Sequence, residues 1–328
     1  MQQNTVDFSS LAGKYIGVIG DVMLDHFVYG NIERISAEAP IPVVLFFEEK
    51  YSPGGAANLA SNITALGSHA SLFGVTGNDL ASGKLFGELE KQNIDISNIA
   101  IDIARPTTEK MRIIGADRHL ARLDKESAEY ISGLIEKELL EKIEREMPRF
   151  DAIVISDYAK GVITKTMAGR VTHLARERSI PILVDTKPKH FSFFKNVSVI
   201  TPNRQEAEGI VGKSIVTDED IKQAGRILQE LSQSHIVMKL SVDGIALFAH
   251  DVVARMPSFA CCVTDVVGAG DTVVAVLAIA LAAKVDLQEA VRIANAAAGV
   301  VVEKSGTAVV CVDEIMHMLQ ERKDIKLA

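Results

Sequence analysis

The chain has 328 residues, and 48% of them are hydrophobic, which is enough for a large buried core within one α/β domain. Its formal net charge is −8 and it has no strong basic cluster, which argues against nucleic acid or an anionic membrane as the main partner. Three sparse cysteines without metal-ligand spacing, Cys261, Cys262 and Cys311, are predicted to be reduced residues of the core.

The sequence carries no pattern typical of export or of membrane insertion. The first residues are polar and lack the apolar stretch of a signal peptide. The longest apolar run, residues 273–283, is too short to span a bilayer. We therefore expect an enzyme of the cytoplasm.

Residues 15–19 form a short apolar run that ends next to Asp21, which predicts a buried first strand. Ligands of open α/β sheets gather at the carboxyl ends of strands, so Asp21 and the nearby Asp25 are candidate ligand contacts. A helix cap or turn for Asp21 and a solvated loop position for Asp25 are the alternatives.

Gly54 and Gly55 open the next predicted helix, residues 56–66. Two glycines let a backbone approach a ligand closely, and Asn58 offers both a donor and an acceptor. A glycine-rich loop with no ligand is the alternative.

Two stretches predict a small sheet outside the main core. Residues 28–51 contain apolar side chains at period two and two prolines, a pattern typical of an edge strand, and residues 111–114 and 119–123 are its predicted partners. Basic residues are concentrated between residues 105 and 124, at Lys110, Arg112, Arg118 and Arg122. Such groups bind phosphate through charge-assisted hydrogen bonds, although strand alternation is expected to turn Arg112 and Arg122 outward.

Strands and helices then alternate, which predicts a parallel sheet with helices on both faces. The predicted strands are residues 70–75, 152–156, 182–184, 198–200 and 236–240, and the predicted helices are residues 80–92, 128–147 and 164–178. Position 78 is Asn78 where a Walker A loop needs glycine, and the first strand lacks a Gly-x-Gly-x-x-Gly turn. These absences argue against a P-loop and against a nicotinamide dehydrogenase.

Asp157 and Asp185 follow two of these strands, with Lys160 and Lys187 close behind as candidate phosphate partners or salt-bridged loop lysines. Asn203 and Glu206 have the spacing of a capping box, and the same spacing suits polar contacts near a nucleotide and its Mg²⁺. The sequence alone leaves both interpretations open.

Residues 265–283 organise the rest of the chain. Gly268, Ala269 and Gly270 leave the first amides of the following helix uncovered, and such a helix start is an anion site. Asp271 beside it suits a base that takes a proton from a hydroxyl attacking phosphorus, whereas a capping role is the alternative. A later helix, residues 287–304, presents small side chains for an adenine or for helix packing.

Residues 265–272 resemble the C-terminal signature of the ribokinase-like (PfkB) sugar kinases, and residues 54–58 resemble the N-terminal glycine-rich signature of that family. The similarity narrows to the D-glycero-β-D-manno-heptose-7-phosphate kinases at residues 20–25, 34–36, 38–44, 156–161, 201–203 and 295–302. One departure is Val267, where most members have threonine. In many bacteria this kinase is fused to an adenylyltransferase, and the present chain resembles the stand-alone form.

The resemblance implies a ribokinase-like three-layer α/β fold in one domain over residues 1–328. Its mostly parallel central sheet has helices on both faces and a small β-sheet lid from about residues 28–51 and 105–124. The implied reaction is ATP-dependent phosphorylation of D-glycero-β-D-manno-heptose 7-phosphate at the C1 hydroxyl, a step toward ADP-heptose for the lipopolysaccharide core. A homodimer through the lid is also implied. Another sugar acceptor, or a non-catalytic sugar-phosphate binding protein, is the alternative.

The resemblance also implies roles for individual residues. Asp271 is the expected base, and the amides of Gly268, Ala269 and Gly270 stabilise the transferring phosphoryl group. The expected sugar-phosphate contacts are Asp21, Asp25, Gly54, Gly55, Asn58, Lys110, Asp157, Lys160 and Lys187. ATP is expected at Asn203, Glu206, Lys239, Ser241, Gly244 and Ala298. Glu206 is expected to reach Mg²⁺ through water, and a monovalent cation such as K⁺ is expected at Asp265, Val267 and Gly306.

Overall fold

The computed structural model describes residues 8–116, 118–249, 252–304 and 308–322. Its body is built on a nine-stranded sheet in the order β13-β12-β11-β10-β9-β8-β1-β4-β5. The bounds of these strands are β1 Tyr15–Gly20, β4 His69–Thr76, β5 Ile99–Ile101, β8 Ala152–Ser156, β9 Ile182–Asp185, β10 Val199–Ile200, β11 His235–Lys239, β12 Ile245–Ala249 and β13 Val252–Met256. All are parallel except β12 and β13, which add antiparallel at one edge.

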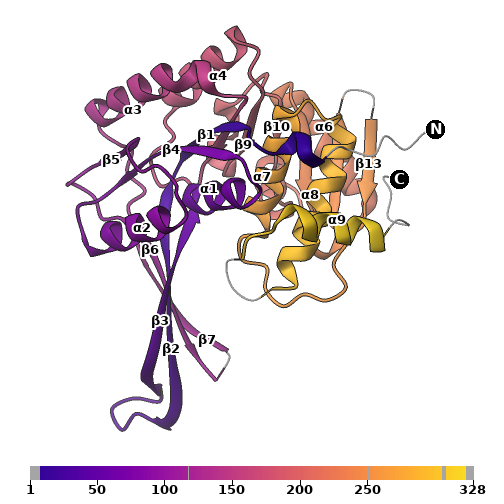
Figure 1. Cartoon of the computed structure of the whole chain (residues 1–328). Coiled ribbons are helices and arrows are strands. Elements are labelled where there is room, and N and C mark those ends of the chain that lie inside the picture. The colour runs from indigo at the N-terminus through magenta and orange to yellow at the C-terminus, as the bar shows by residue number, and fades with distance from the viewer. Residues whose placement is uncertain (1–7, 117, 250–251, 305–307, 323–328) are drawn as a thin grey trace.

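Helices cover both faces of this sheet because its strands are apolar on both faces. Ile16 and Val18 of β1 pack with α1 (Ala56–Ala65), α2 (Leu80–Lys91), α7 (Ala269–Ala282), α8 (Leu287–Val302) and α9 (Val312–Glu321). Ile19 packs into a second core with α3 (Gly133–Glu146), α4 (Lys165–Glu177), α5 (Arg204–Val211) and α6 (Asp218–Ser232). The result is three layers, with the two cores separated by the sheet (Figure 1).

The element bounds differ from the predicted ones chiefly where a polar side chain caps a helix. Residues 128–147 were expected to be helical throughout, but α3 begins at Gly133 because the Ser132 side chain accepts a hydrogen bond from the amide of Ile135. Helix α7 is apolar around its whole circumference, and residues 273–280 are buried in it. A helix of that kind belongs inside a core, and α7 packs against both α1 and α8.

A second sheet of four strands stands out from the body, and we call it the lid (Figure 1). Its order is β3-β2-β6-β7, with bounds β2 Val22–Ile35, β3 Pro42–Gly55, β6 Thr108–Gly115 and β7 Arg118–Lys125. The predicted single edge strand over residues 28–51 is instead a hairpin of two long strands, with β3 at the edge. The chain turns back between residues 36 and 41, around the prolines that suggested an edge.

The three cysteines are free, as expected, but all of them are exposed, so the predicted position in the core is wrong. Cys261 and Cys262 lie in the loop between β13 and α7, and Cys311 is the N-cap of α9. Loops and helix caps lie at the surface, and composition alone does not report that position. Among the described helices, none is long and apolar enough to cross a membrane.

Candidate active site at the carboxyl edge of the sheet

Helix α7 begins at the carboxyl edge of the body sheet with an uncapped turn. Gly268 is its N-cap, with a φ of 83°, and no side chain caps the helix. Glycine adopts this left-handed conformation without the steric cost that a Cβ adds. Gly268, Ala269 and Gly270 all line one cavity, so the positive end of the helix dipole faces open space. This arrangement is compatible with the predicted anion site, in which the Ala269 amide already donates to the Val266 carbonyl at 3.4 Å.

Asp271 lies in the first turn of α7 and is only 6% exposed. Asn58 Nδ2 donates to Asp271 Oδ2 at 2.6 Å, and the Tyr158 hydroxyl donates to Asp271 Oδ1 at 2.8 Å. Burial raises the pKa of Asp271 to about 6, against the lowering effect of those two hydrogen bonds. A carboxylate with this pKa is ionised at neutral pH and is basic enough to accept a proton during reaction.

Helix α1 fixes Asp271 from one side. Asn58 and Asn62 are four residues apart and therefore share one face of α1. Asn58 holds Asp271, and Asn62 Oδ1 accepts a hydrogen bond of 2.8 Å from the Thr272 hydroxyl. Asn58, predicted to bind the sugar, is therefore a direct partner of Asp271.

Two other predicted sugar ligands, Asp21 and Asp157, organise the loop after β8. Asp21 is 1% exposed, and its oxygens accept hydrogen bonds from the amides of Tyr158, Lys160 and Val162 at 2.8, 3.0 and 3.1 Å. Burial raises the pKa of Asp21 to about 6, and these amides oppose that rise.

Asp157 is buried and accepts a hydrogen bond of 2.6 Å from the Thr186 hydroxyl, while its Oδ2 lies 2.9 Å from His190 Nδ1. Both carboxylates are thus occupied by protein groups and hold the loop in place.

Asp25 lies at the base of the lid and pairs with Arg112. Arg112 NH1 donates to Asp25 Oδ1 at 2.5 Å, and burial raises the pKa of Asp25 while the Arg112 guanidinium opposes the rise. Arg112 is 8% exposed, so the expected outward orientation is wrong for it. The base of the lid packs closely there, since a Cβ on Gly54 would lie 2.7 Å from Asp25 Oδ2. Arg122 lies directly opposite Arg112 in the sheet, so it projects from the same face, and the expected outward orientation is wrong for it too, although it is exposed there.

Lys110 and Lys160 meet at one carboxylate. Lys110 Nζ on β6 lies 3.3 Å from Glu126 Oε2 and 3.3 Å from Asp124 Oδ2. Lys160 Nζ, from the loop after β8, lies 2.5 Å from Glu126 Oε1. The structure therefore brings together two predicted phosphate contacts, one from the lid and one from the body, with Glu126 between them. Gly55, which was also assigned to the sugar, joins β3 to α1 with a φ of 57°.

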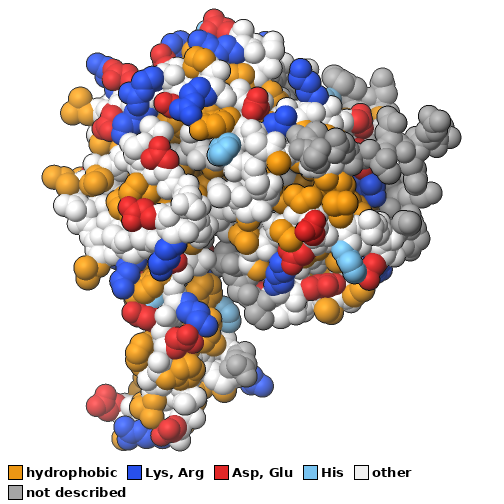
Figure 2. Space-filling view, in the orientation of Figure 1, with side chains coloured by type: hydrophobic (Ala, Val, Ile, Leu, Met, Phe, Trp, Pro, Cys, Tyr) orange, Lys and Arg blue, Asp and Glu red, His pale blue; other side chains and the backbone are white. Residues whose placement is uncertain are grey.

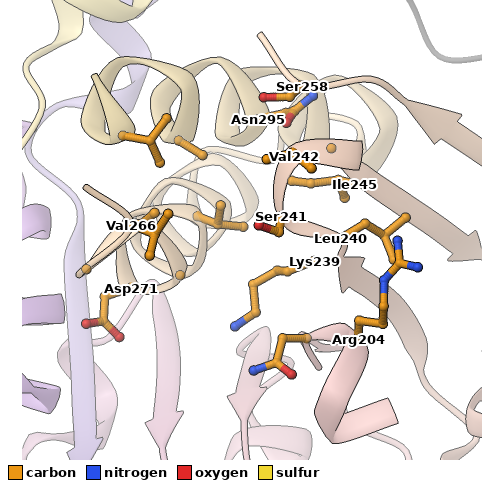
Figure 3. Close-up of a pocket in the computed structure, with 18 of the residues that line it drawn as sticks. Arg204, Lys239, Leu240, Ser241, Val242, Ile245, Ser258, Val266, Asp271 and Asn295 are labelled. Carbon is orange, nitrogen blue, oxygen red and sulfur yellow. The ribbon is translucent and has the colours of Figure 1, made fainter. Parts of the chain in front are cut away.

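A cavity of about 620 Å³ runs from Asp271 along the carboxyl ends of the body strands. The part near Asp271 holds two ion pairs, Lys187 with Glu206 at 2.6 Å and Lys239 with Asp185 at 2.7 Å. Lys239 extends from β11 toward Asp271 (Figure 3). Lys187, predicted as a sugar contact, lines this cavity together with the residues assigned to the nucleotide.

Asn203 and Glu206 form the capping box that their spacing allows. Asn203 Oδ1 accepts from the Glu206 amide at 2.9 Å, and Glu206 Oε2 accepts from the Asn203 amide at 2.8 Å. The capping interpretation is therefore confirmed. Both residues also line the cavity, so a role in binding remains compatible with it.

The opposite end of the cavity is lined mainly by apolar side chains with some polar ones. Leu240 and Val242 lie in the turn between β11 and β12, and Ile245 begins β12. Figure 3 shows Arg204, Ser258 and Asn295 on the same side. Ser241 and Gly244 of this turn line the cavity as well. On α8, Ala298 lines the cavity, whereas the neighbouring alanines 294 and 297 are buried in the core. Small residues on α8 therefore serve packing at two positions and the cavity at one.

The predicted monovalent cation site is only partly described. Asp265 Oδ1 accepts a hydrogen bond of 3.0 Å from the Val267 amide, so the loop before α7 is folded around Asp265. Gly306 lies outside the described residues. Within the described part of the chain, no group of three or more His, Cys, Asp or Glu side chains could hold a metal ion.

Two residues of this site escaped sequence reasoning. Arg112 was placed outward, and Tyr158 was quoted within a motif but given no role. The sequence did offer one signal for Tyr158, because it directly follows Asp157 at the carboxyl end of a predicted strand.

Comparisons with known proteins agree with this geometry. The family model described as "pfkB family carbohydrate kinase" matches residues 14–315. The "Bifunctional protein HldE" of Geobacter sulfurreducens is 40% identical over 304 residues, which cover 92% of this chain and 62% of that protein. The protein of the same name from Helicobacter pylori is 39% identical over 311 residues, 94% of this chain and 67% of its own length. The chain therefore spans about 62% of the first relative's length.

Solved structures share the fold at low sequence identity. Phosphofructokinase-2 from Escherichia coli, in complex with substrates and products, aligns with a TM-score of 0.78 at 17% identity, covering 95% of this chain and 100% of that one. Arabidopsis thaliana ribokinase complexed with ribose and ATP aligns with a TM-score of 0.73 at 18% identity, covering 94% and 99%. The ribokinase-like fold predicted from the sequence is thereby confirmed.

Proposed function

This chain belongs to the PfkB family of carbohydrate kinases, and from that premise we propose that it phosphorylates D-glycero-β-D-manno-heptose 7-phosphate at the C1 hydroxyl with ATP. The product is the 1,7-bisphosphate, on the route to ADP-heptose. The choice of this sugar rests on the motifs at residues 20–25 and 156–161 and on the similarity to the HldE proteins. Because ATP is a cytoplasmic metabolite, the same proposal places the enzyme in the cytoplasm.

One observation carries the reaction type: a buried carboxylate with a raised pKa stands in the first turn of an uncapped helix that opens on a cavity. In the proposed reaction, Asp271 accepts the C1 hydroxyl proton as that oxygen attacks the terminal phosphorus of ATP. The amides of Gly268, Ala269 and Gly270 then stabilise charge on the transferring group. Catalysis of this kind depends on positioning and electrostatics, which a rigid helix start supplies.

The cavity fits a nucleotide in size and in chemistry. Its volume lies in the range usual for small-molecule sites, with an apolar end for a base and cationic residues near Asp271 for phosphates. Lys187 and Lys239 would hold the phosphates, while Ser241, Gly244 and Ala298 would line the base and ribose.

Mg²⁺ would be held through water by Glu206, and when bound it neutralises charge on the phosphates of ATP. Glu206 has oxygen ligands of the kind that Mg²⁺ prefers, but Lys187 and the Asn203 amide already contact them, which favours an indirect site. We also propose K⁺ at Asp265, Val267 and Gly306, because the solved structure of Escherichia coli phosphofructokinase-2 includes a complex with potassium.

The sugar phosphate would lie under the lid. Asp25, Gly54, Gly55 and Asn58 surround the junction of β2, β3 and α1, where hydroxyl groups of a sugar can be bound. Lys110 and Lys160 would bind the distal phosphate of the sugar, and their ion pairs with Glu126 would be replaced by ion pairs with that phosphate. Asp21 and Asp157 would act indirectly, because they hold the loop after β8 in place.

We propose that two lids pair in a homodimer. Large apolar side chains are exposed on the outer part of the lid, and Figure 2 shows them as a hydrophobic surface on the projecting sheet. They are Ile32, Ile35, Ile41, Leu45, Phe46, Phe47 and Leu123. An apolar surface of this kind on a strand edge is stabilised by burial against an identical surface.

A panel of sugar phosphates and free sugars, with ADP release as the readout, tests the proposal. We expect the heptose 7-phosphate to give the highest kcat/KM and ³¹P NMR of the product to show a phosphate on the anomeric carbon. A higher kcat/KM for another acceptor would replace the sugar but keep the reaction type. ATP-independent sugar-phosphate binding with no turnover on any acceptor would make the protein a binding protein instead.

A further inference from the structure

We propose that Tyr158 is a positioning residue for the catalytic base: its hydroxyl holds the Asp271 carboxylate in one orientation through a direct hydrogen bond. The proposal rests on the proposed function for the role of Asp271 as the base. It gives a role to a residue that lies within the motif at residues 156–161 and was assigned none there.

The geometry around Asp271 leaves little freedom for its carboxylate. Each oxygen accepts a hydrogen bond from a different part of the fold, Oδ2 from Asn58 on α1 and Oδ1 from Tyr158 in the loop after β8. Rotation of the carboxylate about its Cβ–Cγ bond would break both bonds together. The remaining lone pairs are thereby fixed relative to α7 and are available for an incoming hydroxyl.

Tyr158 is itself held in place at three points. Its backbone amide donates to buried Asp21 at 2.8 Å, its hydroxyl donates to Asp271, and Lys187 Nζ lies 5.1 Å from the centre of its ring. Lys187 is in turn paired with Glu206 at 2.6 Å. Because the loop, the ring face and the hydroxyl are all fixed, the tyrosine behaves as part of the scaffold of the site.

The protonation of the pair supports a permanent donor. Desolvation and the neighbouring carboxylates raise the pKa of Tyr158 well above its ordinary value, so the phenol keeps its proton throughout the working range. Burial and the nearby charge of Asp185 raise the pKa of Asp271, while the hydrogen bonds from Asn58 and Tyr158 and the charge of Lys239 lower it. The hydroxyl therefore stabilises the ionised form of the base without competing for the proton of the substrate.

The first experiment needs no substrate and is an infrared titration of the Asp271 carboxyl group in the free enzyme. For wild type and for each variant, the spectrum of the same protein carrying Asp271→Asn is subtracted, and the difference reports the Asp271 carboxyl group alone. In Tyr158→Phe, which keeps the ring over Lys187, we expect the midpoint to rise by about one pH unit. Tyr15→Phe is the matched control, since its hydroxyl accepts a bond of 2.6 Å from Arg149 at the opposite end of β1. We expect no shift there.

Kinetics give the second readout, with whichever acceptor the enzyme phosphorylates. We expect the acid limb of the kcat profile in Tyr158→Phe to move up by the same amount and kcat on the plateau to fall about tenfold, with KM for ATP within twofold of wild type. A fall in kcat with no change of either midpoint would overturn the proposal and leave Tyr158 a structural residue. If no sugar is phosphorylated, the proposed function fails, whereas the infrared shift still decides the role of Tyr158.

Discussion

The two sides of the site are held by different chemistry. On the α7 side, Asp271 is fixed by two neutral donors, Asn58 and Tyr158. On the lid side, Asp25 is held by Arg112, while Lys110 and Lys160 are held in ion pairs with Asp124 and Glu126. Neutral donors orient a carboxylate without quenching its charge, whereas the ion pairs of Lys110 and Lys160 can be exchanged for a charged substrate. The hydrogen bonds that orient Asp271 and the ion pairs that a substrate can replace therefore lie on opposite sides of one site.

The α7 side should dominate turnover. We expect Asp271→Asn to lower kcat by about three orders of magnitude, because a general base acts in the transition state. Sugar binding should stay within about tenfold of wild type, since the amide keeps the shape of the side chain. Isothermal titration beside steady-state kinetics separates the two effects. A variant with weak sugar binding and normal turnover would place the base elsewhere.

The buried ion pair of the lid should dominate stability. Arg112→Ala leaves Asp25 buried without its cation, and we expect a loss of about 3 kcal/mol in the free energy of unfolding near neutral pH. The pKa of Asp25 is already raised by burial, so its protonation should reduce this loss as the pH falls. Denaturant unfolding at two pH values measures both effects. Arg122→Ala is the control, an exposed member of the same sheet whose pair with Asp124 is worth at most about 1 kcal/mol.

Turnover should depend on pH through the α7 side. The pKa of Asp271 is raised from 3.8 to about 6, so the carboxylate is ionised above that pH and protonated below it. A protonated base accepts no proton, and kcat should therefore fall about tenfold for each pH unit below about 6. A kcat profile between pH 5 and 8 measures this, with stability checked at each point. Activity that stays level down to pH 5 would mean that proton transfer to Asp271 does not limit turnover.

The smallest effect should come from the exchangeable contacts. Glu126→Gln removes the carboxylate that joins Lys110 and Lys160, and we expect KM for the phosphorylated sugar to fall about threefold with KM for ATP unchanged. Glu141→Gln, an exposed residue of α3 paired with Lys137, serves as the control. A rise in KM would show that Glu126 orients the lysines and does not compete with the phosphate.

Contiguous sequence signals predicted the local structure of the α7 side well. The helix start at 268–270 and the position of Asp271 in its first turn depend on a glycine turn and one apolar run, which local sequence specifies. The order of strands and helices was likewise predicted, since a buried parallel strand has a recognisable apolar run. Boundaries such as the start of α3 depended on the cap at Ser132.

Tertiary partners explain what sequence reasoning missed. Arg112 is buried because the base of the lid packs against Asp25, a contact 87 residues away in the chain. Tyr158 meets Asp271 across 113 residues. The cysteines were placed in the core on their chemistry, whereas loop and cap positions put them at the surface. Lys187 was grouped with the sugar, and the structure places it after β9, in the lining of the same cavity as Lys239.

The central claim is that Asp271 and the amides at the start of α7 face the same phosphorus atom. A crystal structure with Mg²⁺, a non-hydrolysable ATP analogue and the sugar phosphate tests it most directly. The account predicts the terminal phosphate within hydrogen-bonding distance of the Gly268–Gly270 amides and the accepting hydroxyl on Asp271 (Figure 3). A terminal phosphate bound away from the start of α7, with Asp271 contacting neither ligand, would contradict it.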